Sequence, residues 1–214
     1  MSKLKISLLI IGIVLVIDQI LKIWIKTHMM LGQEFRIFDW FIIHFVENNG
    51  MAFGMEFSGR FGKMFLSIFR IVVVFGIGWY LYKLTQKEET TKGFIICLSL
   101  IFAGAIGNII DSAFYGLIFT ESYMQVASFV APGNGYASFL HGRVVDMFYC
   151  PLFSGTYPQW FPFGLGGDKF IFFSPVFNIA DSAISVGIVT LLIFQKRFFA
   201  EVEGVKSEEQ KVEN

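Results

Sequence analysis

Long apolar runs dominate the chain and are separated by shorter polar stretches. Four of the runs are long enough to cross the hydrocarbon core of a bilayer as an α-helix, which takes about 20 residues. They cover residues of about 5–26, 62–83, 93–116 and 175–196. The first run is longer than a secretory signal core and has no small-x-small cleavage site, so we interpret it as a retained helix. This pattern predicts a membrane protein with four transmembrane helices.

The segments between these runs differ in pattern. Residues 35–59 are rich in Phe, Ile and Trp with partial alternation, which predicts short strands at the membrane interface. Residues 117–174 mix Gly, Pro and Asn turn signals with aromatic residues, which predicts an irregular extramembrane region with little regular structure. Residues 201–214 alternate in charge and are expected to form a disordered cytoplasmic tail.

The expected fold class is therefore an all-α membrane protein with a single domain over residues 1–200. Its extramembrane parts would be a small β-rich element after the first helix, at about 30–60, and an enlarged extracytoplasmic region between the third and fourth helices. An even number of spans places both termini on one side of the membrane. Lys and Arg residues at the termini and in the turn at 83–92 modestly favour the cytoplasmic side for them.

Composition agrees with a membrane protein. Of the 214 residues, 55% are hydrophobic and 16% are charged, whereas a typical soluble domain has about 25% charged residues. The formal net charge is zero, so no basic surface points to nucleic acid.

Several charged residues lie in or beside the apolar runs. Asp18 and Lys22 are four residues apart and share a helix face. Asp111 ends the third run, Asp181 begins the fourth, and Asp146 lies between them. A carboxylate within a membrane costs about 2.5–3.5 kcal/mol on insertion scales and usually has a functional role. The topology gathers these side chains at one depth, which predicts one polar site just below the outer surface.

Paired carboxylates are suited to activating water. Two carboxylates within hydrogen-bond distance cannot both ionise easily, so they share a proton. One takes a proton from water, and the other polarises a carbonyl and later protonates the leaving nitrogen. The histidines have no metal-ligand spacing and no GxSxG nucleophile motif is present, so neither a metal nor a cofactor is expected.

A non-enzymatic alternative fits part of this pattern. Buried acidic and Asn side chains also occur in proton- or ion-coupled transporters, although four spans are few and no inverted repeat is visible.

Five short motifs, in order along residues of about 10–190, closely resemble those of the lipoprotein signal peptidases, also called type II signal peptidases. They are Asp18-Gln19-x-x-Lys22, Asn48-Asn49-Gly50-Met51-Ala52-Phe53-Gly54, Gly104-Ala105-x-Gly107-Asn108-x-x-Asp111, Val144-Val145-Asp146 and Phe177-Asn178-Ile179-Ala180-Asp181. The resemblance implies a four-span aspartic protease of the bacterial inner membrane. Such an enzyme removes the signal peptide of a prolipoprotein before a diacylglyceryl-modified cysteine, contacts membrane lipid and is inhibited by the cyclic peptide globomycin. A scaffold that only binds acylated lipoproteins is a further alternative. Formation of a new N-terminal lipidated cysteine and a free signal peptide would exclude the scaffold as a complete account.

The resemblance also implies roles for individual residues. The catalytic dyad of the family falls on Asp146 and Asp181. The matched positions that bind substrate or support the dyad are Asp18, Lys22, Asn48, Gly50, Gly104, Asn108, Asp111, Val144, Asn178 and Ala180. Met51, Phe53 and Met55 alternate near this site and are candidates for an apolar groove that holds a lipid chain.

The sequence departs from the family in two respects. Ser112 stands where the family usually has Arg, and we interpret Arg143 as its replacement. The segments at about 112–141 and 147–174 are longer than is usual in the family. They would either form a lid or widen contacts with substrate, or be surface elaborations without function.

Overall fold

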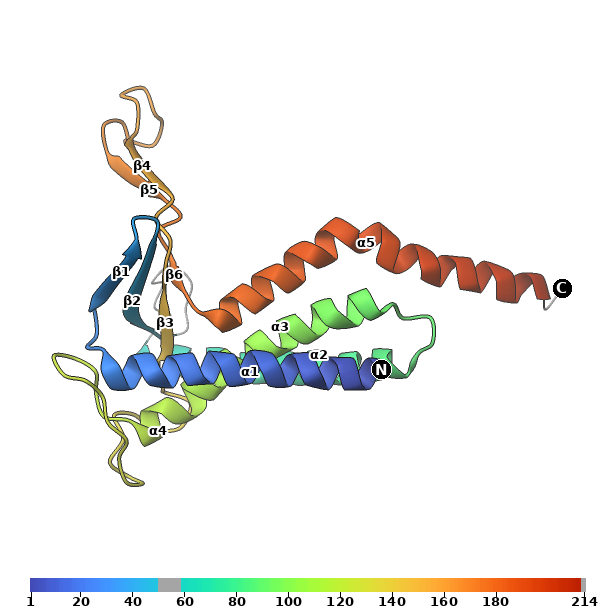
Figure 1. The fold of residues 1–214 in the computed structure, drawn as a ribbon, viewed down its shortest axis with the longest axis horizontal. Coiled ribbons are helices and arrows are strands. Elements are labelled where there is room, and N and C mark those ends of the chain that lie inside the picture. The colour runs from blue at the N-terminus through green and yellow to red at the C-terminus, as the bar shows by residue number, and fades with distance from the viewer. Residues whose placement is uncertain (50–58, 213–214) are drawn as a thin grey trace.

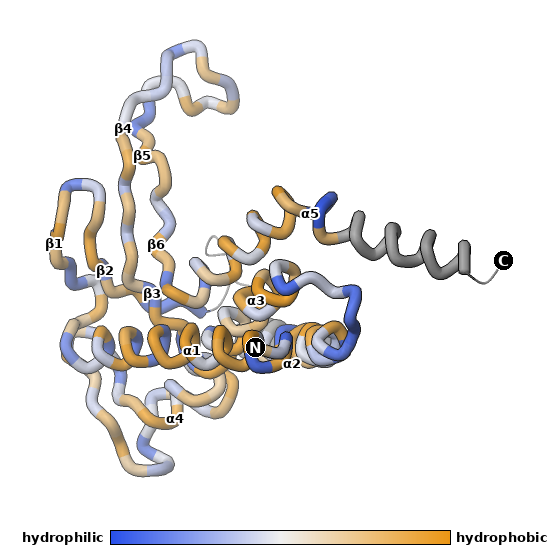
Figure 2. Tube along the Cα trace, turned by 45° about the vertical axis from the view of Figure 1, so that its right-hand side comes forward, coloured by the Kyte–Doolittle hydropathy of each residue, from blue (hydrophilic) through white to orange (hydrophobic). Residues whose placement is uncertain are grey.

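A computed structural model describes residues 1–49 and 59–212, and within that range the side chains of residues 59–63, 66 and 199–212 are left out of the description. Its long helices are α1 (Lys3–His28), α2 (Gly59–Gln86), α3 (Lys92–Ile110) and α5 (Ile179–Val212). In the described part of the chain, four helices are long and apolar enough to cross a membrane. The number of candidate spans agrees with the prediction, and apolar residues run along these helices (Figure 2).

Polar residues begin two of these helices and join two of their ends. Ser2 and Thr91 are N-caps, and their hydroxyls accept hydrogen bonds from the backbone amides of Lys5 and Phe94. The Lys3 Nζ donates to the carbonyls of Lys87 and Glu88, in the turn between α2 and α3. The chain start and this turn therefore lie at the same end of the bundle (Figure 1).

At its far end, α3 changes into a π-helical turn, η2 (Asp111–Tyr115), followed by the short α4 (Gly116–Ile118). Such π-turns are frequent at functional sites. Gly142 packs directly against η2, where its amide donates to the Ser112 carbonyl at 2.8 Å. A Cβ at Gly142 would lie 2.2 Å from the Asp111 carbonyl oxygen, so only glycine allows this approach.

Two antiparallel sheets lie at the end of the bundle where α1 finishes. The larger sheet has the order β1-β2-β3-β6, from β1 (Glu34–Phe38), β2 (Phe41–Asn48), β3 (Val144–Tyr149) and β6 (Val176–Phe177). The smaller sheet is a hairpin of β4 (Phe153–Thr156) and β5 (Lys169–Phe172). The strands run crosswise to α1 (Figure 1).

These sheets correct two sequence-based predictions. The strands expected after the first helix are present as β1 and β2. However, residues 117–174 contain β3, β4 and β5, so the expectation of little regular structure there was wrong. The four helices and the strands after α1 agree with the expected fold class, and the further strands extend its small β-rich element. The fourth span begins at Ile179 rather than near residue 175 because β6 occupies 176–177. Helix α5 extends to Val212, and the disorder expected for residues 201–214 stays a prediction.

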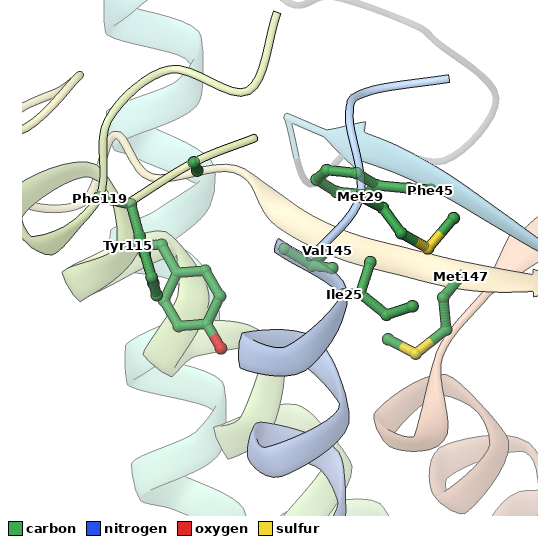
Figure 3. Close-up of a cluster of buried hydrophobic side chains, with 8 residues drawn as sticks. Ile25, Met29, Phe45, Tyr115, Phe119, Val145 and Met147 are labelled. Atoms are coloured by element: carbon green, nitrogen blue, oxygen red, sulfur yellow. The ribbon is translucent and has the colours of Figure 1, made fainter. Parts of the chain in front are cut away.

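A buried apolar cluster joins the sheet to the helices (Figure 3). It takes Ile25 and Met29 from the end of α1, Phe45 from β2, and Val145 and Met147 from β3. Tyr115, Phe119 and Ala127 complete it from the segment after α3. Successive side chains of a strand point to opposite faces of the sheet. Because Val145 and Met147 point into this core, Asp146 lies on the opposite face.

Candidate active site

The side chains of Asp146 and Asp181 converge on one asparagine. Asp146 lies on β3, and Asp181 lies in the first turn of α5. The Asn178 Nδ2 donates to Asp146 Oδ1 at 2.7 Å, and the Asn178 backbone amide donates to Asp181 Oδ2 at 3.2 Å. A strand and a helix that are distant in sequence are thus held together through a side chain at the start of the helix.

The start of α5 has a reciprocal cap that fixes Asp181. Asn178 is the residue before the helix, and its Oδ1 accepts from the Asp181 amide at 2.9 Å while Asp181 Oδ2 accepts from the Asn178 amide. This is the arrangement of a capping box, formed here by Asn and Asp. The amide of Ala180 donates to Asp18 Oδ1 of α1 at 3.0 Å. Three early amides of the helix region therefore have side-chain acceptors.

Asn108 of α3 links Asp181 to a buried ion-pair cluster. Its Nδ2 donates to Asp181 Oδ1 at 2.8 Å, and its Oδ1 accepts from the Lys22 Nζ at 2.9 Å. The Lys22 Nζ also lies 2.9 Å from Asp18 Oδ2 and 2.8 Å from Asp111 Oδ2. The Lys22 ammonium group therefore has three oxygen partners, and the side chains of Lys22 and both aspartates are 0% exposed.

Asp111 acts on the strand that carries Asp146. Its Oδ2 accepts a hydrogen bond from the Val145 backbone amide at 3.2 Å. The carbonyl of Val145 accepts from Asn178 Nδ2 at 3.2 Å. Both backbone groups of the residue before Asp146 are therefore held by site residues, which supports the predicted role of Asp111 as an ordering group.

Two glycines of α3 allow α5 and α1 to approach the site closely. A Cβ at Gly104 would lie 2.2 Å from the Ala180 carbonyl oxygen. A Cβ at Gly107 would lie 2.8 Å from Asp18 Oδ2. Because real Cβ contacts are not this short, larger residues would push the start of α5 and Asp18 away from α3.

Asn48 reaches Asp146 across the sheet. In the β2–β3 register, Asn48 lies opposite the buried Val144, so Asn48 and Asp146 are diagonal neighbours on one face. The Asn48 Nδ2 donates to Asp146 Oδ2 at 3.4 Å. Both carboxylate oxygens of Asp146 therefore receive amide hydrogen bonds.

Asp146 has a perturbed acidity. Burial is the main reason that its pKa is raised to about 7, and the nearby carboxylate of Asp181 adds to the rise. The positive charge of Lys22 and the amide donors of two asparagines oppose it. A carboxyl group that titrates near neutral pH can act as a proton donor or acceptor.

A second buried charge cluster lies on the other face of the β2–β3 pair. Lys26 of α1 pairs with Glu47 of β2, and Ser122 Oγ bridges them, accepting from Lys26 Nζ and donating to Glu47 Oε1, each at 2.9 Å. Arg143 Nη1 lies 2.9 Å from Glu47 Oε2 and also pairs with Glu121. The cluster fastens the segment after α4 to both α1 and β2.

Neighbouring charges favour the ionised forms of Glu47 and Arg143. Burial acts to raise the pKa of Glu47, but Lys26, Arg143 and Ser122 together lower it. Burial likewise opposes the charge of Arg143, whereas Glu121 and Glu47 raise its pKa. Within the described part of the chain, Arg143 pairs with these two glutamates and not with Asp146 or Asp181. Its replacement of the family arginine remains a hypothesis.

Several residues of these clusters were not among the predicted site residues. Gln19 donates to Asp111 Oδ1 at 2.9 Å and accepts from the Tyr115 hydroxyl at 3.2 Å. Lys26 continues the helix face of Asp18 and Lys22 by one more turn, a spacing that the sequence already displayed. Glu47 carried no such signal, because its partners are distant in sequence. Gly50 and the proposed apolar groove at Met51, Phe53 and Met55 lie outside the described residues.

Comparison with known proteins identifies the family. The profile of signal peptidase (SPase) II matches residues 10–197. The chain belongs to the signal peptidase II family. A lipoprotein signal peptidase of Porphyromonas gingivalis is 53% identical over 193 residues, which cover 90% of this chain and 84% of the relative. That of Amoebophilus asiaticus is 38% identical over 185 residues, covering 85% and 73%.

The fold agrees with this membership of the signal peptidase II family. Two solved structures of bacterial membrane enzymes superpose with TM-scores of 0.59 and 0.56, at 26% and 28% identity. They cover 89% and 87% of this chain, and the chain covers 87% and 90% of theirs. Signal peptidase II members are proteases, so the membership favours a peptidase over the transporter and scaffold alternatives, in a multi-pass protein of the bacterial inner membrane.

Proposed function

We propose that this protease removes signal peptides from diacylglyceryl-modified prolipoproteins. Asp146 and Asp181 would catalyse hydrolysis of the peptide bond that precedes the lipidated cysteine of the substrate. The observation that carries the proposal is the pair of hydrogen bonds from Asn178, which holds one carboxylate from β3 and one from α5 at a single point. The relatives named as lipoprotein signal peptidases supply the substrate class.

The environments of the two carboxylates divide their roles. Asp146, with a pKa raised to about 7, holds the shared proton. Asp181 lies at the N-terminus of α5, where the helix dipole favours negative charge. Asp181 is therefore the base and Asp146 the acid, as in other carboxylate pairs whose environments differ.

The reaction then proceeds in two steps. Asp181 takes a proton from a water molecule while the water oxygen bonds to the scissile carbonyl carbon. At the same time the protonated Asp146 donates a hydrogen bond to the carbonyl oxygen. The C–N bond then breaks, and the leaving nitrogen receives a proton from the pair. The products are the free signal peptide and a lipoprotein whose N-terminus is the lipidated cysteine.

The two ends of the bundle support an arrangement in the membrane. The chain start and the α2–α3 turn lie together, and β3, the strand that contains Asp146, lies at the opposite end (Figure 1). With the positive-inside bias of that turn, this favours cytoplasmic termini and a site near the outer leaflet. The substrate lipid would enter from that leaflet, and globomycin-type peptides would compete with it.

Asp146→Asn and Asp181→Asn test the proposal. Each variant should abolish cleavage of a diacylglyceryl-modified precursor while the thermal unfolding midpoint in detergent remains close to that of the parent protein, because Asn is nearly isosteric with Asp. Cleavage that persists in both variants would exclude the dyad. Cleavage by the parent protein of an unmodified precursor at the same rate would exclude the lipidated substrate class.

A further inference from the structure

The β4–β5 hairpin is an extended arm of the protein. Backbone hydrogen bonds extend the strand pairing at both ends of the hairpin, from the Leu152 amide to the Phe172 carbonyl and from the Tyr157 amide to the Asp168 carbonyl. Figures 1 and 2 both show the hairpin extending beyond β1 and β2, away from the helices. Its strands hydrogen-bond to each other in a sheet of their own.

The hairpin has one aromatic face and one more polar face. Residues directly opposite in an antiparallel pair share a face, so the pair Phe153–Phe172 lies on the same side as Phe170, two residues along. The rings of Phe153 and Phe172 stack at 4.7 Å, and Tyr157 contacts Phe170 at 4.7 Å and Phe161 at 4.4 Å. We call Phe153, Tyr157, Phe161, Phe170 and Phe172 the aromatic face. The other face presents Ser154, Thr156, Lys169 and Ile171.

This arm exposes apolar surface that water does not favour. Trp160 and Phe163 at the tip are 80% and 92% exposed, and Phe153 and Phe172 are also exposed. Residues 150–175 include only two charged residues, Asp168 and Lys169. An isolated two-stranded hairpin is marginal in water, and a contiguous exposed apolar patch marks a contact with a partner or a membrane.

The position of the hairpin indicates that its exposed apolar surface contacts the lipid bilayer. The hairpin is inserted between β3 and β6, and α5 starts at Ile179, two residues after β6 ends. Its base therefore lies at the level where a membrane span begins. Because the strands run crosswise to α1, the arm extends along the bilayer surface rather than into water (Figure 1). Trp and Tyr side chains favour this headgroup level.

We propose that the aromatic face and the tip of the β4–β5 hairpin lie in the headgroup–acyl boundary of the leaflet on the side of Asp146 and Asp181. The lipid contact supplies the apolar environment that the hairpin lacks within the protein. Because the arm continues directly from β3, it also holds the strand of Asp146 at a fixed depth relative to the membrane. The long segment at 147–174 then serves as a membrane-surface anchor.

Fluorescence quenching in the full-length protein tests this contact. The chain has four tryptophans, so replacing Trp24, Trp40 and Trp79 by Phe leaves Trp160 as the single reporter. The protein is placed in nanodiscs of phosphatidylethanolamine and phosphatidylglycerol with acyl chains brominated at a shallow position. An interfacial Trp160 should lose about half of its emission to brominated lipid and be poorly quenched by aqueous iodide.

A reporter on the polar face is the matched control. Thr156→Trp, combined with Trp160→Phe, places the fluorophore on the opposite face near the same end of the hairpin. It should be quenched less by brominated lipid and more by iodide than Trp160. Equal lipid quenching at the two positions would overturn the assignment of the aromatic face.

Two other outcomes would overturn the proposal. In the first, brominated lipid has no effect on Trp160 and iodide quenches it as strongly as free indole. In the second, brominated lipid has no effect and iodide is excluded only after a diacylglyceryl-modified precursor peptide is added, which would assign the face to substrate. Circular dichroism and thermal unfolding of the reporter variants confirm that each is folded.

Discussion

The Nδ2 of Asn178 lies 2.7 Å from Oδ1 of Asp146, although the two residues belong to a helix start and a strand. The same side chain caps α5 and so fixes Asp181. One asparagine thus positions both members of the proposed dyad. Its two functions, as a helix cap and as an amide donor to Asp146, can be separated by substitution.

Asn178→Ser should separate them. Serine is as good an N-cap as asparagine, so the unfolding free energy should fall by no more than about 1 kcal/mol. The Nδ2 donor is lost, however, and a misplaced Asp146 should lower kcat by about 100-fold. Asn178→Ala should reduce kcat similarly and also lower the unfolding midpoint, because it lacks a cap. Near-parental turnover in Asn178→Ser would show that the amide donor does not position Asp146.

The acidity of Asp146 predicts how activity and stability depend on pH. Turnover should fall as the pH rises through about 7, because Asp146 then loses the proton that it donates. Stability should change in the same direction. A carboxyl group whose pKa is higher in the folded than in the unfolded protein stabilises the fold at low pH, and this contribution is lost as the pH rises through the folded value.

Asn48→Ala should move this dependence. The Asn48 amide donates to Asp146 and favours its ionised form, so its removal should shift the alkaline limb of the kcat profile to higher pH by about half a unit. The measurement is the midpoint of that limb rather than the level of activity. A lower activity with an unmoved midpoint would indicate that Asn48 contacts substrate only.

Gly104→Ala should disturb the packing of α3 against α5. The new methyl group would meet the Ala180 carbonyl oxygen, and overpacking of this kind typically costs about 1–3 kcal/mol. Since the start of α5 carries Asp181, kcat should fall together with the unfolding midpoint. Gly76→Ala in α2 is the control, because a Cβ there meets nothing within 4 Å, so kcat should stay unchanged and the unfolding midpoint should not fall. Equal effects at the two positions would exclude a specific contact.

Glu47→Gln should destabilise the sheet that carries Asp146. It leaves Lys26 buried without its charge partner, and breaking a buried pair typically costs about 3–5 kcal/mol. The double variant Lys26→Met and Glu47→Gln should recover much of this loss, because it removes the uncompensated charge. Thermal unfolding in detergent measures both. A double variant as unstable as Glu47→Gln would show that the ion pair itself is not the origin of the effect.

The sequence by itself determined the candidate spans and the local spacing of charged residues along them. Apolar runs of sufficient length must cross the membrane as helices, because each helix satisfies its own backbone hydrogen bonds. The spacing of Asp18 and Lys22 places both side chains on one helix face, where they form an ion pair at 2.9 Å. These features depend on residues close in sequence, and so a local pattern is enough to predict them.

Only the tertiary structure decided how the strands and the second charge cluster are arranged. The pairing of β2 with β3 joins residues about a hundred positions apart, as for Asn48 and Asp146, and no local pattern encodes such a partner. The same holds for Glu47 with Arg143 and for the cap that Asp18 provides to α5. Residues 144–149 form a strand because β2 and β6 supply hydrogen bonds on both sides of them. The sequence of that segment alone does not reveal these two partners.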